Sequence, residues 1–537
     1  MSEQNSKYLY PLAFALVLAF GVFLGTRIAP ASSGKPTQIE SRNTYTKIDS
    51  ILQFIDKRYV DSINADSLVH VLINNFLNKQ ETIDSLFKML DPHSNYIPAK
   101  ELQSFNEDLQ GNFDGIGIEF NIINDTIYVV AALAGGPSEK LGILSGDKIV
   151  AINDSIVAGN GITNESVVRM LRGKKGTQVN VKIYRKGEPD LLAFEITRDK
   201  IPVNSVDVSY MVTPEIGYIR INKFGKETPY EFAEGIEKLK KAGMKKLIMD
   251  LRGNPGGYLT GAVDLADQLL PGKKLIVYTD GRSVGRSDYF SSKIGAFETG
   301  DLAVLINEGS ASASEILSGA LQDNKRATII GHRSFGKGLV QEVYTLPDNS
   351  AIRLTIARYY TPNGKSIQRS YAGGVDAYYD QYVSILMNGG ELPDSLKNNP
   401  DMDWGIHPDI QVPVDTSAEA VYFNRLYNRG FINQFAYSYY SDHTAKFSAY
   451  KNVTEFNQNF QVDDEMFKLF IAFADSRDST FRVTEEKALP VRNKIDIAIK
   501  AFLARQKWGN DGFFPIMNEI DMDFQEALKF LTTEGSK

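Results

Sequence analysis

From residue 215 onward the chain alternates between short apolar runs and amphipathic stretches, and this alternation constrains the fold more than any other feature. The expected strands cover residues 217–221, 246–251, 302–306 and 327–330, and the expected helices cover residues 228–242, 259–270 and 312–321. Strands that alternate with helices in this way predict a mostly parallel sheet with helices packed against it.

Two further apolar runs, residues 340–346 and 351–360, flank the sequence Pro347-Asp348-Asn349. Turn-forming residues between two strand-like runs predict a β-hairpin. The α/β part of the chain therefore ends with a hairpin, and we assign residues 201–385 to one α/β domain.

Length and composition narrow the class of protein. A chain of 537 residues is long enough for three or four domains. The net charge of −7 argues against a nucleic-acid partner, which would require clustered positive charge. The absence of cysteine excludes disulfides and zinc–cysteine sites, and the five histidines form no metal-binding motif. We therefore predict no metal and no cofactor.

The N-terminus carries an uncharged segment between Lys7 and Arg27, of which residues 8–25 are almost entirely apolar. This length approaches the ~20 residues that a membrane-spanning helix needs. The segment predicts a single-pass membrane anchor within residues 1–30. The alternative is a cleaved signal peptide, because residues 29–31 resemble a small-residue cleavage site.

The remaining segments differ in their patterning. Residues 31–102 show helical spacing, and residues 103–200 show short alternating strands with glycine-rich turns. Residues 386–537 read as mostly helical and contain no catalytic motif. A packing or partner-binding region is the expectation there, as an adaptor surface or a homo-oligomer interface.

Two motifs of the α/β part match known functional patterns but lack the required context. Residues 281–285 match the G-x-S-x-G pattern of a hydrolase nucleophile, yet no helix is expected after them. Residues 331–338 nearly match a phosphate-binding loop, but Gly338 stands where a magnesium-binding Ser or Thr is needed, and a strand follows. Neither segment is expected to carry the function.

The segment from Asn307 to Glu315 follows a strand and opens a helix, and it allows two interpretations. Ser312 with Glu315 fits a helix capping box. Ser312 also fits a nucleophile at a helix N-terminus, where backbone N–H groups stabilise an oxyanion. The residues of this segment alone do not decide between the two.

A resemblance to a known family decides for the nucleophile. Several separated motifs resemble, in the same order, those of the C-terminal-processing (tail-specific) serine peptidases: Leu90-Asp-Pro-His-Ser-Asn95, Asp250-Leu-Arg-Gly-Asn-Pro-Gly-Gly257, Ser310-Ala-Ser-Ala-Ser-Glu-Ile316 and Phe335-Gly-Lys-Gly338. The resemblance covers residues 45–370 and implies a helical N-terminal domain, a PDZ-like β domain and an α/β peptidase core of the ClpP/crotonase kind. The helical extension after residue 385 lies outside it.

By this resemblance, Ser312 is the nucleophile, Lys337 is the general base and Gln341 orients the lysine amine. A lysine can act as a base only when it is neutral, so its pKa must fall below the ordinary value of about 10.4, as burial would cause. Backbone N–H groups of Ala313 and of Gly256 and Gly257 are expected to form the oxyanion hole. The chain is thus expected to be a serine endopeptidase.

The glycine-rich segment at the start of the β domain resembles the carboxylate-binding loop of PDZ domains. It consists of Gly115, Ile116, Gly117 and Ile118. Successive N–H groups in such a loop bind a terminal carboxylate, and the peptide adds as a β-strand. The expected partners are proteins or peptides with apolar C-termini. The alternative is a non-catalytic membrane-tethered PDZ scaffold, whose hallmark would be loss of Ser312 or Lys337.

The expected location is the bacterial inner membrane with the catalytic domains in the periplasm, or the periplasm itself if the N-terminus is cleaved.

Overall fold

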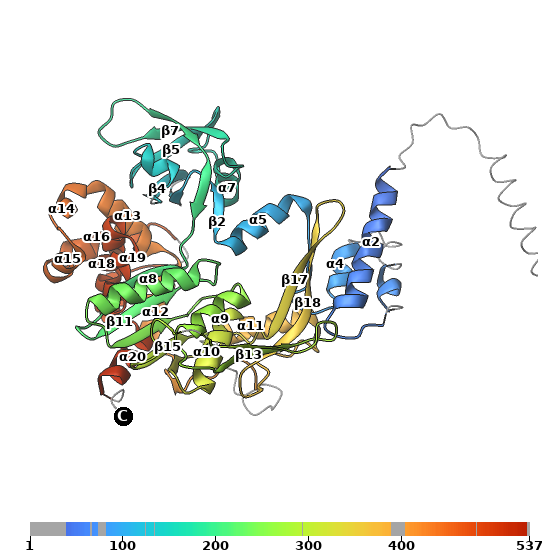
Figure 1. The fold of residues 1–537 in the computed structure, drawn as a ribbon. Coiled ribbons are helices and arrows are strands. Elements are labelled where there is room, and N and C mark those ends of the chain that lie inside the picture. The colour runs from blue at the N-terminus through green and yellow to red at the C-terminus, as the bar shows by residue number, and fades with distance from the viewer. Residues whose placement is uncertain are drawn as a thin grey trace, which may run out of the picture. The chain divides into compact units, whose positions relative to one another are not determined.

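A six-stranded sheet with the strand order β10-β11-β12-β15-β16-β19 forms the centre of the α/β part (Figure 1). Its strands are β10 (Val206–Met211), β11 (Ile216–Ile221), β12 (Lys246–Asp250), β15 (Leu302–Ile306), β16 (Thr328–Gly331) and β19 (Ile410–Gln411). Strands β11 to β19 are parallel, and β10 pairs antiparallel at one edge. The predicted parallel sheet is confirmed, and β10 and β19 are additions that the sequence pattern did not indicate.

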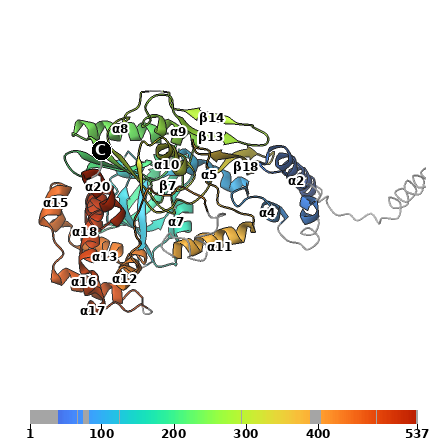
Figure 2. The same cartoon turned by 90° about the horizontal axis from the view of Figure 1, so that it is seen from below.

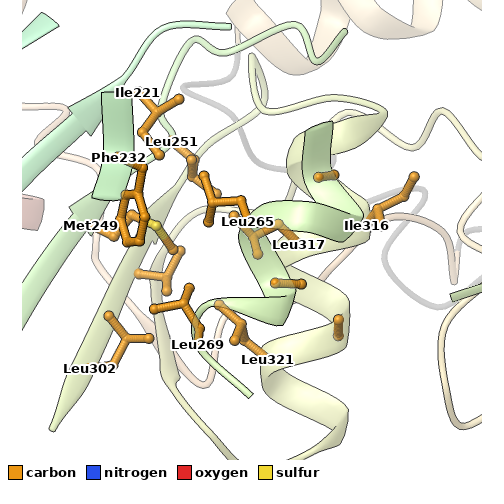
Figure 3. Close-up of a cluster of buried hydrophobic side chains, with 14 of the residues drawn as sticks. Ile221, Phe232, Met249, Leu251, Leu265, Leu269, Leu302, Ile316, Leu317 and Leu321 are labelled. Carbon is orange, nitrogen blue, oxygen red and sulfur yellow. The ribbon is translucent and has the colours of Figure 1, made fainter. Parts of the chain in front are cut away.

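Three helices cover one face of this sheet: α8 (Thr228–Lys241), α9 (Leu259–Asp267) and α10 (Ala313–Asp323). Leu247 and Met249 of β12 point into this layer, where they are fully buried with Leu265 and Leu317. Figure 3 shows the side chains of α9 and α10 meeting those of the strands. Each Å² of apolar surface that is buried in this layer contributes roughly 25 cal/mol to stability. The layer therefore stabilises the part of the fold that carries the site.

The opposite face of the sheet is covered by α20 (Met522–Thr533), the last helix of the chain. Successive residues of a strand point to opposite faces, so Tyr218 and Ile248 turn away from α8–α10. They form a second core with Phe524 and Leu531 of α20. The C-terminal end of the chain thus closes the sheet that its middle part begins.

A second sheet contains β1 (Asn95–Ile97), β13 (Leu275–Asp280), β14 (Ser287–Phe290), β17 (Leu339–Thr345) and β18 (Ala351–Tyr360). Strands β17 and β18 form the predicted hairpin, with Asn349 at φ +62° in its turn. Asn95 of β1 pairs with Arg353 of β18. This pairing places the segment that ends at His93 beside the hairpin.

A β domain spans residues 112–202. It contains β2 (Asn112–Gly115), β3 (Ile118–Ile123), β4 (Thr126–Ala132), β5 (Lys148–Ile152), β6 (Ser155–Ile156), β7 (Gln178–Tyr184), β8 (Leu192–Thr197) and β9 (Asp199–Pro202), with helices α6 (Pro137–Lys140) and α7 (Asn164–Leu171). Alternate residues of β7 are buried, as a half-exposed strand requires. Strand β3 pairs with β4 alone and lies at the edge of its sheet.

Helix α11 (Gly374–Met387) follows the second sheet. The C-terminal part is helical, as predicted, and Figure 2 shows its labelled helices gathered together. Their bounds are α12 (Ala418–Asn428), α13 (Phe431–Asp442), α14 (Thr444–Ser448), α15 (Val453–Asn459), α16 (Asp464–Asp475), α17 (Glu485–Ala488), η2 (Leu489–Val491), α18 (Arg492–Trp508) and α19 (Asn510–Met517). Helices α12 to α19 share a core rich in phenylalanine, with Phe456 and Phe470 fully buried.

The structure is a computed structural model that describes residues 39–64, 67–72, 82–123, 125–133, 135–292, 294–387, 403–478 and 481–533. The N-terminal helices are α2 (Ile39–Arg58), α4 (Thr82–Phe87) and α5 (Ala99–Gln110). Among the described residues, no helix combines the length and apolarity needed to cross a bilayer. The predicted anchor at residues 8–25 lies outside the described residues. Residues 53–537 form one compact unit that contains every site discussed below.

Candidate active site

Ser312 lies at the turn between β15 and α10, in the backbone conformation φ +55°, ψ −111°. A non-glycine residue with positive φ is strained, and such strain persists where the surroundings impose it. Ser312 and Glu315 form the predicted capping box at the start of α10. The N–H of Glu315 donates to the Ser312 carbonyl oxygen at 2.9 Å, and Oε2 of Glu315 accepts from the Ser312 N–H at 2.8 Å. A hydroxyl that accepts in a capping box keeps its own proton, so the Ser312 O–H can still donate to a base.

Glu315 is fully buried and joins the serine segment to the loop between β16 and β17. Its carboxylate accepts from Ser334 Oγ at 2.6 Å, from the Gly336 N–H at 2.7 Å and from the Lys337 N–H at 2.9 Å. Burial raises its pKa, although these hydrogen bonds oppose that shift. One carboxylate therefore holds the main chains of both predicted catalytic residues.

Tyr359 of β18 connects the same two segments from the other side. Its hydroxyl lies 3.0 Å from the carbonyl oxygen of Ser312 and also contacts the carbonyl oxygen of Lys337. No sequence pattern indicates this role, because Tyr359 lies in a strand whose pattern indicates only burial. Together, Tyr359 and Glu315 bring residues 25 positions apart in the chain to one place.

Lys337 is half-buried, and among the described residues its Nζ has no hydrogen-bond or ion-pair partner. Burial lowers the pKa of Lys337 to about 8, and the nearby positive charge of Arg353 contributes in the same direction. Asp91 and Glu315 oppose the shift without cancelling it. The amine is thus far easier to deprotonate than an ordinary lysine.

The surroundings of Lys337 also include His93, whose side chain is likewise partly buried. Burial, assisted by the charges of Lys337 and Arg353, lowers the pKa of His93 to about 3. His93 is therefore neutral at physiological pH. Its Nε2 lies 3.2 Å from the hydroxyl of Tyr378.

Gly256 lies directly against the nucleophile. With φ at +97°, a β-carbon on Gly256 would lie 2.8 Å from Ser312 Cβ and 2.9 Å from the Ala313 nitrogen, so only glycine fits there. The N–H of Gly256 donates to Asn254 Oδ1 at 2.9 Å. In the described part of the chain, the N–H groups of Ala313 and Gly257 have no such partner. These two groups are the ones left to form an oxyanion hole.

Gln341 lies on β17 at an irregularity in its pairing with β18. Its Nε2 is buried and has no hydrogen-bond partner among the described residues. A buried amide nitrogen without a partner is costly. The predicted orienting role of Gln341 stays a prediction.

The predicted tail-binding loop joins β2 to β3 and makes its hydrogen bonds within the β domain. Gly115 pairs with Asp199, and Gly117 has φ +74°. Ser138 donates its N–H and its hydroxyl to the Ile116 carbonyl oxygen. Ile118 opens β3, the edge strand to which an added peptide strand could pair.

The structure also places the two motifs that the sequence analysis set aside. Residues 281–285 form the turn between strands β13 and β14, and residues 331–338 run from β16 into β17. A strand, and not a helix, follows each of them. The contexts that a nucleophile elbow or a phosphate loop requires are therefore missing, as expected.

Comparisons with known proteins agree with this geometry. Residues 215–377 match peptidase family S41, residues 115–196 match the PDZ domain, and residues 422–509 match a family of unknown function (DUF8443). The carboxy-terminal-processing protease of Bartonella bacilliformis is 35% identical over 438 residues, a match that covers 78% of this chain and 96% of that protein.

Other relatives match over shorter parts. A Staphylococcus aureus protein named "Probable CtpA-like serine protease" is 34% identical over 323 residues, which is 60% of this chain and 62% of that protein. Among solved structures, the photosystem II D1 C-terminal processing protease is 27% identical with a TM-score of 0.40, and the match covers 69% of this chain and 93% of that chain. By its sequence matches, this chain belongs to peptidase family S41 and is a serine peptidase with a PDZ domain.

Proposed function

We propose that this serine peptidase cleaves protein substrates by a Ser312–Lys337 dyad through an acyl-enzyme. The observation that carries the proposal is the shared Glu315 carboxylate, which holds both main chains while the pKa of Lys337 falls to about 8. A serine hydroxyl that can donate its proton and a lysine that deprotonates near neutral pH supply the nucleophile and the base that acyl transfer needs.

The reaction then has two stages. The Lys337 amine takes the proton of the Ser312 hydroxyl while Oγ forms a bond to the scissile carbonyl carbon. The resulting oxyanion accepts hydrogen bonds from the N–H groups of Ala313 and Gly257. The protonated lysine then gives its proton to the leaving amine as the C–N bond breaks. A water molecule, deprotonated by the same lysine, hydrolyses the acyl-enzyme and frees Ser312.

The dyad is tested with Ser312→Ala and Lys337→Ala, using cleavage of an unfolded protein and labelling by a fluorophosphonate probe. We expect Ser312→Ala to lose both cleavage and labelling, and Lys337→Ala to lose cleavage, with thermal unfolding unchanged in both. Ser283→Ala is the matched control for labelling, because Ser283 lies in the turn between β13 and β14, outside the candidate site. Full cleavage by either dyad variant would refute the mechanism.

We also propose that the PDZ domain recognises apolar C-terminal tails of substrates. The proposal is supported by the glycine-rich loop at residues 115–118 and by β3 as an edge strand. A peptide with a free C-terminal carboxylate should bind more tightly than the same peptide with a C-terminal amide, because the loop N–H groups require an anionic acceptor. Equal affinities in a fluorescence titration would contradict this mode of recognition.

For location, we propose that residues 8–25 anchor the chain in the bacterial inner membrane with the catalytic domains in the periplasm. The uncharged length of this segment supports the proposal. Release of the protein from membranes by alkaline carbonate would contradict the anchor and favour a cleaved signal peptide.

A further inference from the structure

Arg252 lies at the start of the loop that leads from β12 to Gly256 and Gly257. Its guanidinium is 12% exposed and contacts carboxylates on two sides. Within its own loop, Nη2 donates to Asp250 Oδ2 at 2.8 Å and Nε donates to Oδ1 at 3.1 Å. On the other side, Nη1 donates to Asp521 Oδ1 at 2.8 Å and to Asp523 Oδ2 at 2.9 Å.

Asp521 directly precedes α20 and Asp523 lies in its first turn, 269 and 271 positions away from Arg252. Asp521 also caps α20, because its Oδ1 accepts from the Phe524 N–H at 3.0 Å. Asp523 faces His332 at 3.5 Å in addition to Arg252. Both carboxylates are thus fixed by α20, which is itself packed onto the sheet.

Asp250, the partner of Arg252 within its own loop, has further contacts. Asp250 is fully buried and accepts from Tyr218 Oη at 2.7 Å and from Arg220 Nη1 at 2.8 Å. Burial alone would raise the pKa of Asp250, but Arg252 and Arg220 outweigh burial and hold the pKa below its ordinary range. Arg220 in turn lies over the ring of Phe514 in α19, 5.2 Å from its centroid.

The main chain leads from this cluster to Asn254, whose hydrogen bonds reach the segment of the nucleophile. Two residues beyond Arg252, the Asn254 side chain accepts from the Gly256 N–H at 2.9 Å. The Asn254 carbonyl oxygen accepts from the Ala311 N–H at 3.0 Å and from Ser314 Oγ at 2.9 Å. Any shift of the loop at Arg252 is therefore carried to both sides of the oxyanion hole.

We propose that Asp521 and Asp523 are positioning residues for the oxyanion loop, so that the C-terminal region completes the active site of its own chain. The inference rests on the proposed function, because it assigns these residues a role in oxyanion stabilisation. Buried ion pairs add little net stability but fix one geometry among several. The double contact from α20 thus selects the loop position in which Gly257 and Ala313 face the same oxygen.

The test uses the full-length chain with Asp521→Asn and Asp523→Asn, singly and together. Asparagine keeps an acceptor oxygen, and so the helix cap at position 521, while it removes the charge that holds Arg252. The matched control is Glu526→Gln, which removes from the same helix a carboxylate that pairs with the exposed Lys529. The readouts are kcat and KM for a quenched peptide substrate, the inhibition constant of a peptide boronic acid, and thermal unfolding.

We expect the double variant to lose kcat by at least about 10-fold with KM changed by less than about 2-fold, because only the transition state uses the oxyanion hole. Boronate affinity should fall in proportion to kcat/KM, since the boronate presents a tetrahedral oxyanion. Adding the two changes to Arg252→Ala should cause no further loss in kcat/KM, because the aspartates act through Arg252.

Unchanged kcat and boronate affinity in the double variant, with an active wild type, would overturn this inference alone. A loss of activity that follows a lower unfolding temperature, with boronate affinity unchanged in the folded fraction, would likewise overturn it and leave α20 a structural element only. A wild-type protein that neither cleaves the peptide nor binds the boronate would overturn the proposed function, and this inference with it.

Discussion

The lowered pKa of Lys337 predicts a specific pH dependence for cleavage. With a pKa of about 8, about one amine in ten is neutral at pH 7, whereas an ordinary lysine with a pKa of 10.5 would be neutral in about one case in 3,000. The site therefore raises the population of active base by roughly 300-fold. We expect kcat/KM to rise about 10-fold for each pH unit below 8 and to level off above it.

Arg353 offers a way to move this curve. Its positive charge helps to lower the pKa of Lys337, so removing that charge must raise this pKa and shift the rising limb to higher pH. Arg353→Gln is the suitable change, because the amide nitrogen of glutamine can replace Nε, which donates to the His93 carbonyl oxygen at 3.1 Å. At pH 7 the kcat/KM of the variant should be lower than that of the wild type. At a pH above the pKa of Lys337 in both proteins, the two values should converge.

The assay is kcat/KM for a quenched peptide from pH 5.5 to 10, with Arg358→Gln as the matched control. Arg358 lies on the same strand but pairs with Asp61 at 2.8 Å, and it is not among the charges that shift the pKa of Lys337. The control should leave the limb where it is. His93 cannot produce this limb, because its pKa lies near 3. A curve that is flat between pH 6 and 9, or one that Arg353→Gln lowers equally at every pH, would refute the reasoning.

Two other substitutions probe the frame around the nucleophile. Gly256→Ala should reduce kcat by at least about 100-fold while thermal unfolding remains cooperative, because the added carbon would lie 2.8 Å from Ser312 Cβ and displace the oxyanion loop. Glu315→Ala should lower the free energy of unfolding in urea by at least about 4 kcal/mol, because it leaves four donors without an acceptor at about 1–3 kcal/mol each. A loss of less than about 1 kcal/mol would show that water replaces the carboxylate.

Much of the fold could be predicted from the sequence, because periodicity encodes it locally. The run at residues 178–184 alternates between buried and exposed residues as a half-covered strand does, and the structure has β7 there. Helix α8 begins at Thr228, where the apolar spacing of the sequence changes to that of a helix. Strands β13 and β14 were not predicted. The glycine-containing segment 281–285, which matches a nucleophile motif, is the turn between them.

At the candidate site, sequence motifs predict the catalytic residues but not the residues that hold them in place. Glu315 could be read from the sequence as a helix cap, and it is one, but the same carboxylate also binds the loop at Gly336 and Lys337, which no local pattern indicates. The positive φ of Ser312 was equally hidden, because no local pattern of the sequence marks it. Sequence motifs therefore predict the reacting groups, whereas the residues that hold them are seen only in the folded structure.

The C-terminal region shows why such supports escape sequence reasoning. Asp521 and Asp523 lie among many acidic residues, and no periodicity marks them as partners of a loop 269 or more positions away. Their position follows from Phe524 and Leu531, whose burial on the sheet face of Ile248 sets α20 in place. Hydrophobic packing is non-directional and only brings the helix to the sheet, whereas the aspartate–arginine contacts fix its register against the active-site loop. Sequence changes in this region should therefore be judged by what they do to Arg252, and not only by their effect on stability.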